Sequence, residues 1–481
     1  MPRLAPSLFR RAGRISPHLA TLLPACRTLE SAQIELRWIR RHVQEITRRT
    51  QSAPNNPDDT NEDNQKNGAA LFLRNGEDPR RHRAKIKPKG KPGANSSRCK
   101  AVLDEDRVAR LVARRGAGEP LQYVLGTQPF GDLEILCEKG VLIPRPETEA
   151  WASMLADLVF SSPEGKADDL RILDLCSGTG CIGLSLFARG MAALSRAGYI
   201  NGENTEAPLR VFGLDVESRA VRLARRNLMH NFRGSRHGAY LDRSGLAEEA
   251  LKGAITFRQA NIFADEWMAY LDEAKPRECE KGDKQDRARR VDILVSNPPY
   301  ISQRGFDADT GRSVRNYEPK LALVPPGVSS SLSTATIPTS AALSSCAPED
   351  IFYARLLEIA DKLRPRIAVF EVGDMKQAIR VAEMALSRSR SPSRSAPETT
   401  QSGEGDEPMG QTEARWDVVE IWRDVPDCRP SDAEEDVIFV RGREVPVRGS
   451  GHGRAVFLAE GQMMRNKFTN RGFRQEVYTD S

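Results

Sequence analysis

The residues best suited to chemistry stand at the end of an apolar run, 291–300 (VDILVSNPPY). The run predicts a buried strand. Pro298 and Pro299 end it, because neither has an N–H for a sheet ladder and each fixes its own φ. Asn297 and Tyr300 should therefore lie on a stiff loop at the carboxyl end of that strand. An amide beside an aromatic ring suits the binding of a planar group, such as another amide or a nucleobase edge.

A second pattern is the glycine-rich stretch 172–183 (ILDLCSGTGCIG). A predicted strand reaches Asp174, and small residues then turn the chain into a helix. Gly178 and Gly180 would let a ligand approach the backbone close to the start of that helix. The dinucleotide fingerprint G-x-G-x-x-G is incomplete, since Cys176 stands at one of its places. By itself this pattern fits either nucleotide-type binding or a turn made for packing.

A third pattern is 210–215 (RVFGLD), a predicted second strand that ends in Asp215. An acid there can bind the ribose hydroxyls of an adenosine cofactor, although it can also cap a helix. The long gap before it is explained by a polar insert at 191–208. In a doubly wound sheet the first and fourth strands are neighbours, and ligands bind between their carboxyl ends. Residues 174–180 and 297–300 are therefore expected side by side.

The elements that position these residues follow from the pattern beyond Leu170, where strand-like runs alternate with helical ones. Such alternation predicts an α/β domain with a doubly wound, largely parallel sheet. The expected strands are 171–175, 210–214, 255–258, 291–295, 366–370, 416–421 and 455–458. The expected helices are 182–188, 218–230, 350–363 and 375–387. Disordered inserts are expected near 191–208, 232–250, 272–289, 327–348 and 388–414.

A linker is predicted before this domain, at 118–146. Its apolar runs 133–136 and 141–143 flank a Lys-Gly pair, which predicts a β-hairpin. Pro146 and the acids that follow it favour a helix start, with the helix running to about Phe160.

The N-terminal part has helical periodicity at 25–49 and again at 104–115. Between them, 50–99 is rich in Asn, Asp, Pro and Lys, and a disordered insert is expected there. Residues 25–117 should thus form a small helical domain. At the other end, 461–481 is expected to be a tail.

Composition excludes several classes of protein. The 72 basic and 66 acidic residues nearly balance, which does not indicate a dedicated nucleic-acid surface. The eight cysteines include no CxxC pair, so reduced thiols are expected and no metal site. No apolar run of about 18 residues predicts a membrane span. The chain has no G-x-S-x-G, HExxH or P-loop motif, and no histidine stands near the patterns above, so a strong general base is not expected.

The N-terminus has the composition of a targeting segment. Five arginines precede the first acid, Glu30, and Leu4, Leu8 and Phe9 make the start weakly amphipathic. This pattern is typical of a mitochondrial transit peptide, here placed at 1–24, although a merely basic tail would share it.

With these residues in view, the chain resembles the HemK/PrmC family of S-adenosylmethionine-dependent protein-glutamine N5-methyltransferases. The resemblance is carried by 118–126 (GEPLQYVLG), 140–149 (GVLIPRPETE), 172–186 (ILDLCSGTGCIGLSL), 295–301 (VSNPPYI), 316–323 (NYEPKLAL) and 370–373 (FEVG). It implies a seven-stranded, Rossmann-like class I methyltransferase domain at 147–460. It also implies that 25–117 recognises the substrate and that 118–146 is the hairpin linker.

The resemblance also implies an activity and site residues. The family methylates the glutamine of the Gly-Gly-Gln motif in class I peptide-chain release factors. By position, cofactor-binding residues would be Asp174, Cys176, Ser177, Gly178, Thr179, Gly180, Asp215, Asn261, Ile262 and Asn297. Substrate-binding residues would be Asn297, Pro298, Pro299 and Tyr300, of which Asn297, Pro298 and Tyr300 would be catalytic. Residues 144–149 would close over the site.

Two residues depart from the family pattern. Cys176 stands where the family usually has glycine, which would weaken cofactor binding. Asn261 replaces an acid, and its side-chain oxygen could still accept from the adenine amino group.

The expected partner is a mitochondrial release factor in the matrix, without stable binding to nucleic acid or membrane. The alternatives are an adenine-N6 methyltransferase acting on DNA or RNA, which would use the same NPPY loop on a flipped base, and a catalytically silent binding protein on this scaffold. A dehydrogenase is disfavoured by the incomplete fingerprint.

Overall fold

A computed structural model describes residues 4–52, 95–160, 170–198, 209–232, 251, 253–273, 291–326, 346–388 and 415–461. The chain divides into two units, Met1–Leu125 and Gly126–Ser481. The inserts expected at 232–250, 272–289, 327–348 and 388–414 and the tail at 461–481 lie almost wholly outside the described residues, as does most of 50–99.

The first unit is helical. Its helices are α1 (Pro6–Ile15), α2 (Pro17–Cys26), α3 (Leu29–Ser52), α5 (Asn95–Gly116) and α6 (Leu121–Leu125). The expected single helix from 25 to 49 is wrong at its start, because Arg27 adopts a left-handed conformation with φ of 68° and separates α2 from α3. The segment expected to target the protein, 1–24, thus spans α1 and most of α2. Leu22 and Leu23 of α2 are fully buried, in one core with Ile39 and Val112.

The second unit opens with a two-stranded hairpin of β1 (Thr127–Phe130) and β2 (Leu133–Leu136). The prediction of a hairpin around Lys139-Gly140 was wrong, since the turn falls at Gly131, where φ is 56°. The run 141–143 forms no strand. Instead, the backbone N–H of Ile143 donates to the carboxylate of Glu318, 3.1 Å away.

A nine-stranded sheet forms the centre of this unit, with the strand order β5-β4-β3-β6-β7-β11-β8-β10-β9. Its strands are β3 (Leu170–Leu175), β4 (Leu209–Asp215), β5 (Ile255–Gln259), β6 (Ile293–Ser296), β7 (Ile367–Glu371), β8 (Val418–Val425), β9 (Val437–Val440), β10 (Arg443–Arg448) and β11 (Ser450–Ala459). The five neighbouring strands β5, β4, β3, β6 and β7 run parallel, and β11 is antiparallel to β7 and β8. The predicted α/β class is confirmed. The hairpin of β9 and β10 extends the expected seven strands.

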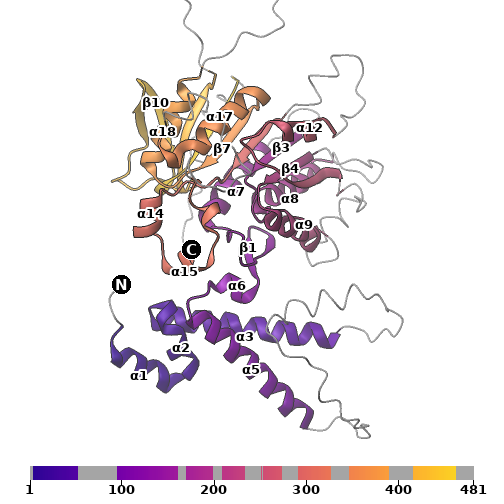
Figure 1. The fold of residues 1–481 in the computed structure, drawn as a ribbon, viewed down its shortest axis with the longest axis vertical. Helices are drawn as coiled ribbons and strands as arrows, with labels where there is room; N and C mark the ends of the chain where they lie inside the picture. The colour runs from indigo at the N-terminus through magenta and orange to yellow at the C-terminus, as the bar shows by residue number, and fades with distance from the viewer. Residues whose placement is uncertain are drawn as a thin grey trace, which may run out of the picture. The chain divides into compact units, whose positions relative to one another are not determined.

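Both faces of the sheet are covered by helices (Figure 1). One face packs against α7 (Pro146–Phe160), α8 (Cys181–Arg196) and α9 (Ser218–Phe232). The other packs against α17 (Ile351–Leu363), α18 (Met375–Leu386) and the 265–273 region, which holds η2 (Glu266–Met268) and α12 (Ala269–Glu273). Side chains alternate between the faces, as Ile172 and Leu173 do on β3.

Four short helices complete the described part of this unit: α14 (Gln303–Ala308), α15 (Arg312–Tyr317), η3 (Lys320–Ala322) and η4 (Pro348–Asp350).

Helix α8 corrects one predicted boundary. The insert expected from residue 191 begins later, because α8 continues to Arg196 and buries Gly190 and Met191. An added Cβ at Gly190 would lie 2.7 Å from the ring of Phe160. The small residue allows α8 to pack closely against α7, so a sequence that looked like a break is part of the core.

Candidate active site

The glycine-rich turn lies between β3 and α8, as predicted. Three of its residues have a left-handed backbone, with φ of 60° at Cys176, 55° at Gly178 and 79° at Gly180. Glycine adopts this conformation freely, whereas a residue with a Cβ is strained there by about 1–2 kcal/mol. An added Cβ at Gly180 would also lie 2.8 Å from the ring of Phe257. Cys176 therefore occupies a position whose backbone favours glycine.

Asp215, at the end of β4, is joined to this turn. Its Oδ2 accepts from the backbone N–H of Gly178 at 2.8 Å, and its Oδ1 accepts from that of Glu217 at the same distance. Burial raises the pKa of the Asp215 carboxyl to about 6, although both backbone donors oppose that shift. An added Cβ at Gly178 would meet no atom within 4 Å, so the turn is open on that side.

Two buried polar atoms of the turn have no hydrogen-bond partner among the described residues. One is Asp174 Oδ1, and the other is Ser177 Oγ. The second oxygen of Asp174 accepts from the backbone N–H of Gly183 at 3.0 Å, which anchors the first turn of α8. Burial raises the pKa of Asp174 to about 7. Since buried polar atoms nearly always have a partner, these two fit a turn that receives a polar ligand.

The loop after β5 carries Asn261 and Ile262. The backbone N–H of Ala260 donates to the carbonyl of Asp215 at 2.9 Å, which joins this loop to the end of β4. The Oδ1 of Asn261 accepts from the backbone N–H of Phe263 at 3.1 Å, so part of its acceptor capacity serves the loop itself. Ile262 is buried.

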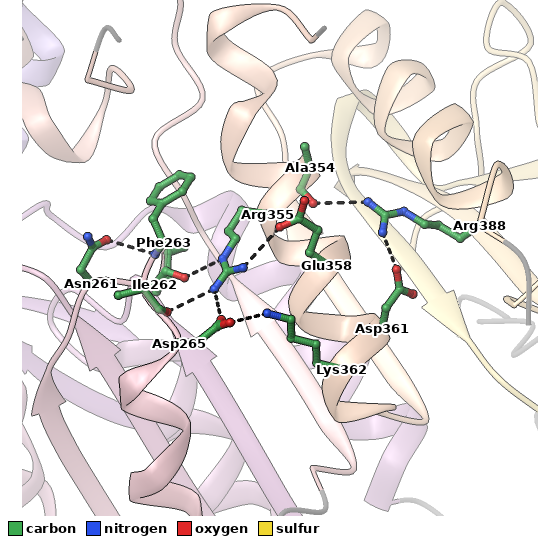
Figure 2. A network of polar contacts seen from close by, with 11 residues as sticks. Asn261, Ile262, Phe263, Asp265, Ala354, Arg355, Glu358, Asp361, Lys362 and Arg388 are labelled. Carbon is green, nitrogen blue, oxygen red and sulfur yellow. Dashed lines mark hydrogen bonds and ion pairs between the residues drawn. The ribbon is translucent and has the colours of Figure 1, made fainter. Parts of the chain in front are cut away.

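Arg355 of α17 is hydrogen-bonded to this loop, as Figure 2 shows. Its Nε donates to the carbonyl of Ile262 at 2.8 Å, and its Nη2 donates to the carbonyl of Ala264 and to the Asp265 carboxylate. The Arg355 side chain is only 4% exposed. Sequence reasoning missed this residue, because a lone arginine on a helix gives no signal of the carbonyls it will meet.

The NPPY loop follows β6 and lies beside the glycine-rich turn. β6 pairs in parallel with β3, and Ser296 Oγ donates to the carbonyl of Leu175 at 2.8 Å. The predicted neighbourhood of the two strand ends is therefore confirmed. Pro298 and Pro299 are buried, whereas Asn297 and Tyr300 are partly exposed.

Asn297 and Tyr300 are both linked by hydrogen bonds to one buried acid, Glu371, at the end of β7. Tyr300 donates its hydroxyl to Glu371 Oε1 at 3.2 Å. Asn297 Nδ2 lies 3.3 Å from Thr148 Oγ1, and Thr148 in turn donates to Glu371 Oε2 at 2.6 Å. Trp151 Nε1 donates to the same oxygen at 2.8 Å. Sequence reasoning placed Glu371 in the FEVG motif but gave it no role.

Burial dominates the electrostatics of this cluster. It raises the pKa of Glu371, while the donors from Thr148, Trp151 and Tyr300 and the nearby charge of Arg454 oppose the shift. It also raises the pKa of Tyr300, so that hydroxyl stays protonated and acts as a donor.

A second acid ties the 144–149 stretch to the NYEP motif. Glu318 is buried, and it accepts from the backbone N–H of Ile143 and from Arg145 Nη2 at 2.8 Å. Helix α7 begins directly afterwards at Pro146, with Glu147 and Glu149 in its first turn. Two motifs far apart in the sequence are thus joined by hydrogen bonds directly before α7, the helix that carries Thr148.

Within the described ranges, no cluster of His, Cys, Asp or Glu could hold a metal ion. Six of the cysteines in those ranges have free thiols: Cys26, Cys137, Cys176, Cys181, Cys346 and Cys428. No helix in the same ranges has the length and apolar character needed to cross a membrane.

No protein-family model matches the chain. Individual proteins are nevertheless similar to it in sequence. The mitochondrial MRF1 N(5)-glutamine methyltransferase MTQ1 of Saccharomyces cerevisiae is 30% identical over 325 residues, covering 67% of this chain and 68% of that protein. The chain belongs to the release factor glutamine methyltransferase family.

Two further relatives agree with that membership in this methyltransferase family. The probable MRF1 mitochondrial N(5)-glutamine methyltransferase mtq1 of Schizosaccharomyces pombe is 35% identical, covering 45% of this chain and 55% of that protein. The release factor glutamine methyltransferase of Haemophilus influenzae is 36% identical over the same share of this chain, with 57% of that protein covered. The chain thus spans little more than half the length of these two.

Among solved structures, the N-terminal domain of human METTL16 in complex with SAH is similar at 15% identity. The match covers 55% of this chain and 68% of that one, with a TM-score of 0.26. At that score the likeness carries no weight for the site residues.

Proposed function

We propose that the chain transfers a methyl group from S-adenosyl-L-methionine to the side-chain amide nitrogen of a glutamine, in the Gly-Gly-Gln motif of a peptide-chain release factor. The observation that carries this proposal is the position of Asn297 and Tyr300. They lie at the end of β6, and the glycine-rich turn lies at the end of the neighbouring β3. A loop suited to binding an amide and a turn suited to binding the cofactor thus lie at the carboxyl ends of two neighbouring parallel strands.

The residues of the turn fit the cofactor. The open side of Gly178 admits a ligand close to the backbone, and Asp174 Oδ1 and Ser177 Oγ are buried atoms that lack a partner in the described chain. Cys176, Thr179 and Gly180 complete the turn. When bound there, the cofactor supplies an electrophilic methyl group on a sulfonium.

The remaining cofactor contacts are assigned along the same edge. Asp215 holds the ribose hydroxyls, since each of its oxygens accepts only one backbone N–H and keeps a further lone pair. Asn261 and the buried Ile262 border the adenine, in the loop that Arg355 fixes.

The substrate amide is held by acceptors and by a ring. An amide nitrogen is a poor nucleophile, because its lone pair is delocalised. Asn297 Oδ1 and the carbonyl of Pro298 accept its two hydrogens, and the ring of Tyr300 packs on the amide plane. Pro299 keeps the loop stiff. The rate then comes from orientation and from fixed dipoles, and a proton can leave after transfer without a catalytic histidine.

The partner and compartment are assigned from the relatives. The two yeast relatives carry mitochondrial MRF1 methyltransferase names. We assign this chain to the mitochondrial matrix, with a mitochondrial release factor as its substrate and the helical unit as the part that recognises it. No observation favours the alternative of adenine methylation over this assignment.

The test is transfer of labelled methyl to a purified mitochondrial release factor. The wild-type factor should gain one methyl group on its Gly-Gly-Gln peptide, seen by peptide mass, and a Gln→Ala version should gain none. Free DNA and RNA oligonucleotides serve as the controls for the alternative. Equal labelling of the two release factors would overturn the proposal.

A further inference from the structure

Asn297 can bind a substrate amide only if the correct end of its own side chain faces that amide. The oxygen and the NH2 group of asparagine are alike in size, and half a turn about the side chain exchanges them. With the oxygen outward the residue accepts from an amide, and with the NH2 outward it donates to a carboxylate. If the proposed function holds, the Asn297 oxygen must face the substrate, and a neighbouring group has to fix that orientation.

Thr148 is the neighbour that decides it. Thr148 is 2% exposed, and its hydroxyl lies between two partners, Glu371 Oε2 at 2.6 Å and Asn297 Nδ2 at 3.3 Å. A hydroxyl has a single proton to donate. If that proton goes to Glu371, the hydroxyl presents only a lone pair to Asn297. Asn297 must then donate to it from its NH2 group.

Glu371 fixes the direction of that proton. Glu371 is 1% exposed, and its carboxylate receives three donors, from Thr148, Trp151 and Tyr300. The indole N–H of Trp151 can only donate, and it shares Oε2 with Thr148. A carboxylate facing only donors is the arrangement of the ionised form, which has no proton to offer Thr148.

We propose that Thr148 and Glu371 are positioning residues that hold Asn297 with its amide oxygen toward the substrate, and that they thereby select a carboxamide over a carboxylate. A glutamate at the substrate position has no N–H for Asn297 Oδ1 and would set its own oxygens against that atom. A site built to receive N–H donors rejects an analogue that lacks them, because its buried acceptor is left unpaired.

The test compares Thr148→Val with Thr148→Ser. Binding is measured by calorimetry, with S-adenosylhomocysteine present, for the release factor and for its Gln→Glu version. Wild type and Thr148→Ser should bind the glutamine version at least about tenfold more tightly than the glutamate version. In Thr148→Val the two affinities should lie within about threefold of each other, because the Asn297 side-chain amide is free to rotate and exchange its oxygen and NH2.

Kinetics give a second measure on the same variants. Thr148→Val should lose about tenfold or more in kcat while its affinity for S-adenosylhomocysteine is unchanged, and Thr148→Ser should recover most of the loss. Thr256→Val makes the same chemical change on β5, away from this cluster, and should match wild type in both measurements.

Glu371→Gln separates orientation from charge. Trp151 Nε1 can only donate, so the new amide must turn its oxygen toward Trp151 and Thr148 and its NH2 toward Tyr300. The orientation of Asn297 is then preserved, and this variant should keep the preference for the glutamine version.

Wild-type discrimination and wild-type kcat in a folded Thr148→Val would overturn the proposal, as would loss of discrimination in a folded Glu371→Gln. An inactive wild type would instead contradict the proposed function.

Discussion

Asn297 is the residue on which the proposed chemistry depends most directly. It is partly exposed directly after β6, and its side chain donates a hydrogen bond to Thr148 at 3.3 Å. Its contribution should therefore appear in the transfer step and hardly at all in folding or cofactor binding. Cys176, by contrast, lies in the glycine-rich turn, and Asp215 at the end of β4 accepts a hydrogen bond from that turn, where the proposed function puts the cofactor.

Replacing Asn297 by alanine should lower kcat by about a hundredfold or more, because one preorganised dipole of this kind is worth that much. The affinity for S-adenosylhomocysteine, measured by calorimetry, should stay within about twofold of wild type. Turnover near the wild-type rate would show that Asn297 does not hold the substrate amide.

Cys176→Gly should raise the free energy of unfolding by about 1 kcal/mol, because glycine relieves the strain of a left-handed backbone with φ of 60°. It should also tighten cofactor binding by removing a Cβ from the turn. Chemical denaturation and calorimetry measure the two effects. Cys176→Ala is the matched control, since it removes the thiol and keeps the Cβ. If alanine gave the same gains, backbone strain would not be their source.

Cofactor affinity should depend on the ionisation of Asp215, whose pKa burial raises to about 6. The ionised carboxylate keeps one lone pair on each oxygen for a hydroxyl donor, and protonation removes one of them, so affinity should fall as the pH drops through that value. Asp174, with a pKa of about 7, titrates in a neighbouring range. In calorimetry across pH 5 to 8, cofactor affinity should change near pH 6 as Asp215 titrates and near pH 7 as Asp174 titrates. Asp215→Asn should bind the cofactor weakly and lack only the lower step, near pH 6. A lower step that survived in this variant would belong to another group.

At the scale of elements, loops are held by side chains that lie far away in the sequence. The loop after β5 is bonded to Arg355 of α17, and the stretch before α7 is bonded to Glu318 (the first is drawn in Figure 2). A guanidinium suits this work, because its several N–H groups can satisfy carbonyls and a carboxylate at once.

Arg355→Met should weaken cofactor binding by about tenfold, because the loop with Asn261 and Ile262 loses three hydrogen bonds from its support. Calorimetry gives the affinity, and thermal unfolding shows how much of the protein remains folded. Arg366→Met is the control, since the Arg366 side chain is 67% exposed. Unchanged affinity in a folded Arg355→Met would exclude a role for the loop in cofactor binding.

At the scale of the whole molecule, the chain forms two units with separate cores. The proposed function divides the work between them, with chemistry in the second unit and recognition of the release factor in the first. Helix α2 contributes Leu19, Leu22 and Leu23 to the first core, so the segment that resembles a targeting sequence also carries part of the fold.

Leu22→Ala should destabilise the helical unit by about 2–5 kcal/mol, as expected for a fully buried leucine. We expect KM for the release factor to rise while affinity for the cofactor is unchanged. Circular dichroism during thermal unfolding and steady-state kinetics measure the two effects. Leu103→Ala, at a position 58% exposed, should leave both unchanged. An equal loss of cofactor affinity in Leu22→Ala would contradict the division of work.

The sequence by itself determined the sheet class, the glycine-rich turn and the NPPY loop. These depend on local features: apolar periodicity, proline's missing N–H, and glycine's freedom at positive φ. Local patterns also placed Asn297 and Asp215 at the ends of their strands.

The tertiary structure alone decided what those residues meet. Glu371, Thr148 and Trp151 form one hydrogen-bonded cluster although more than 200 residues separate the acid from the other two. The same holds for Arg355 and its carbonyls, and for α8, which continues past Gly190 against the ring of Phe160. Each is set by a partner distant in the chain, and no local periodicity records the identity of that partner.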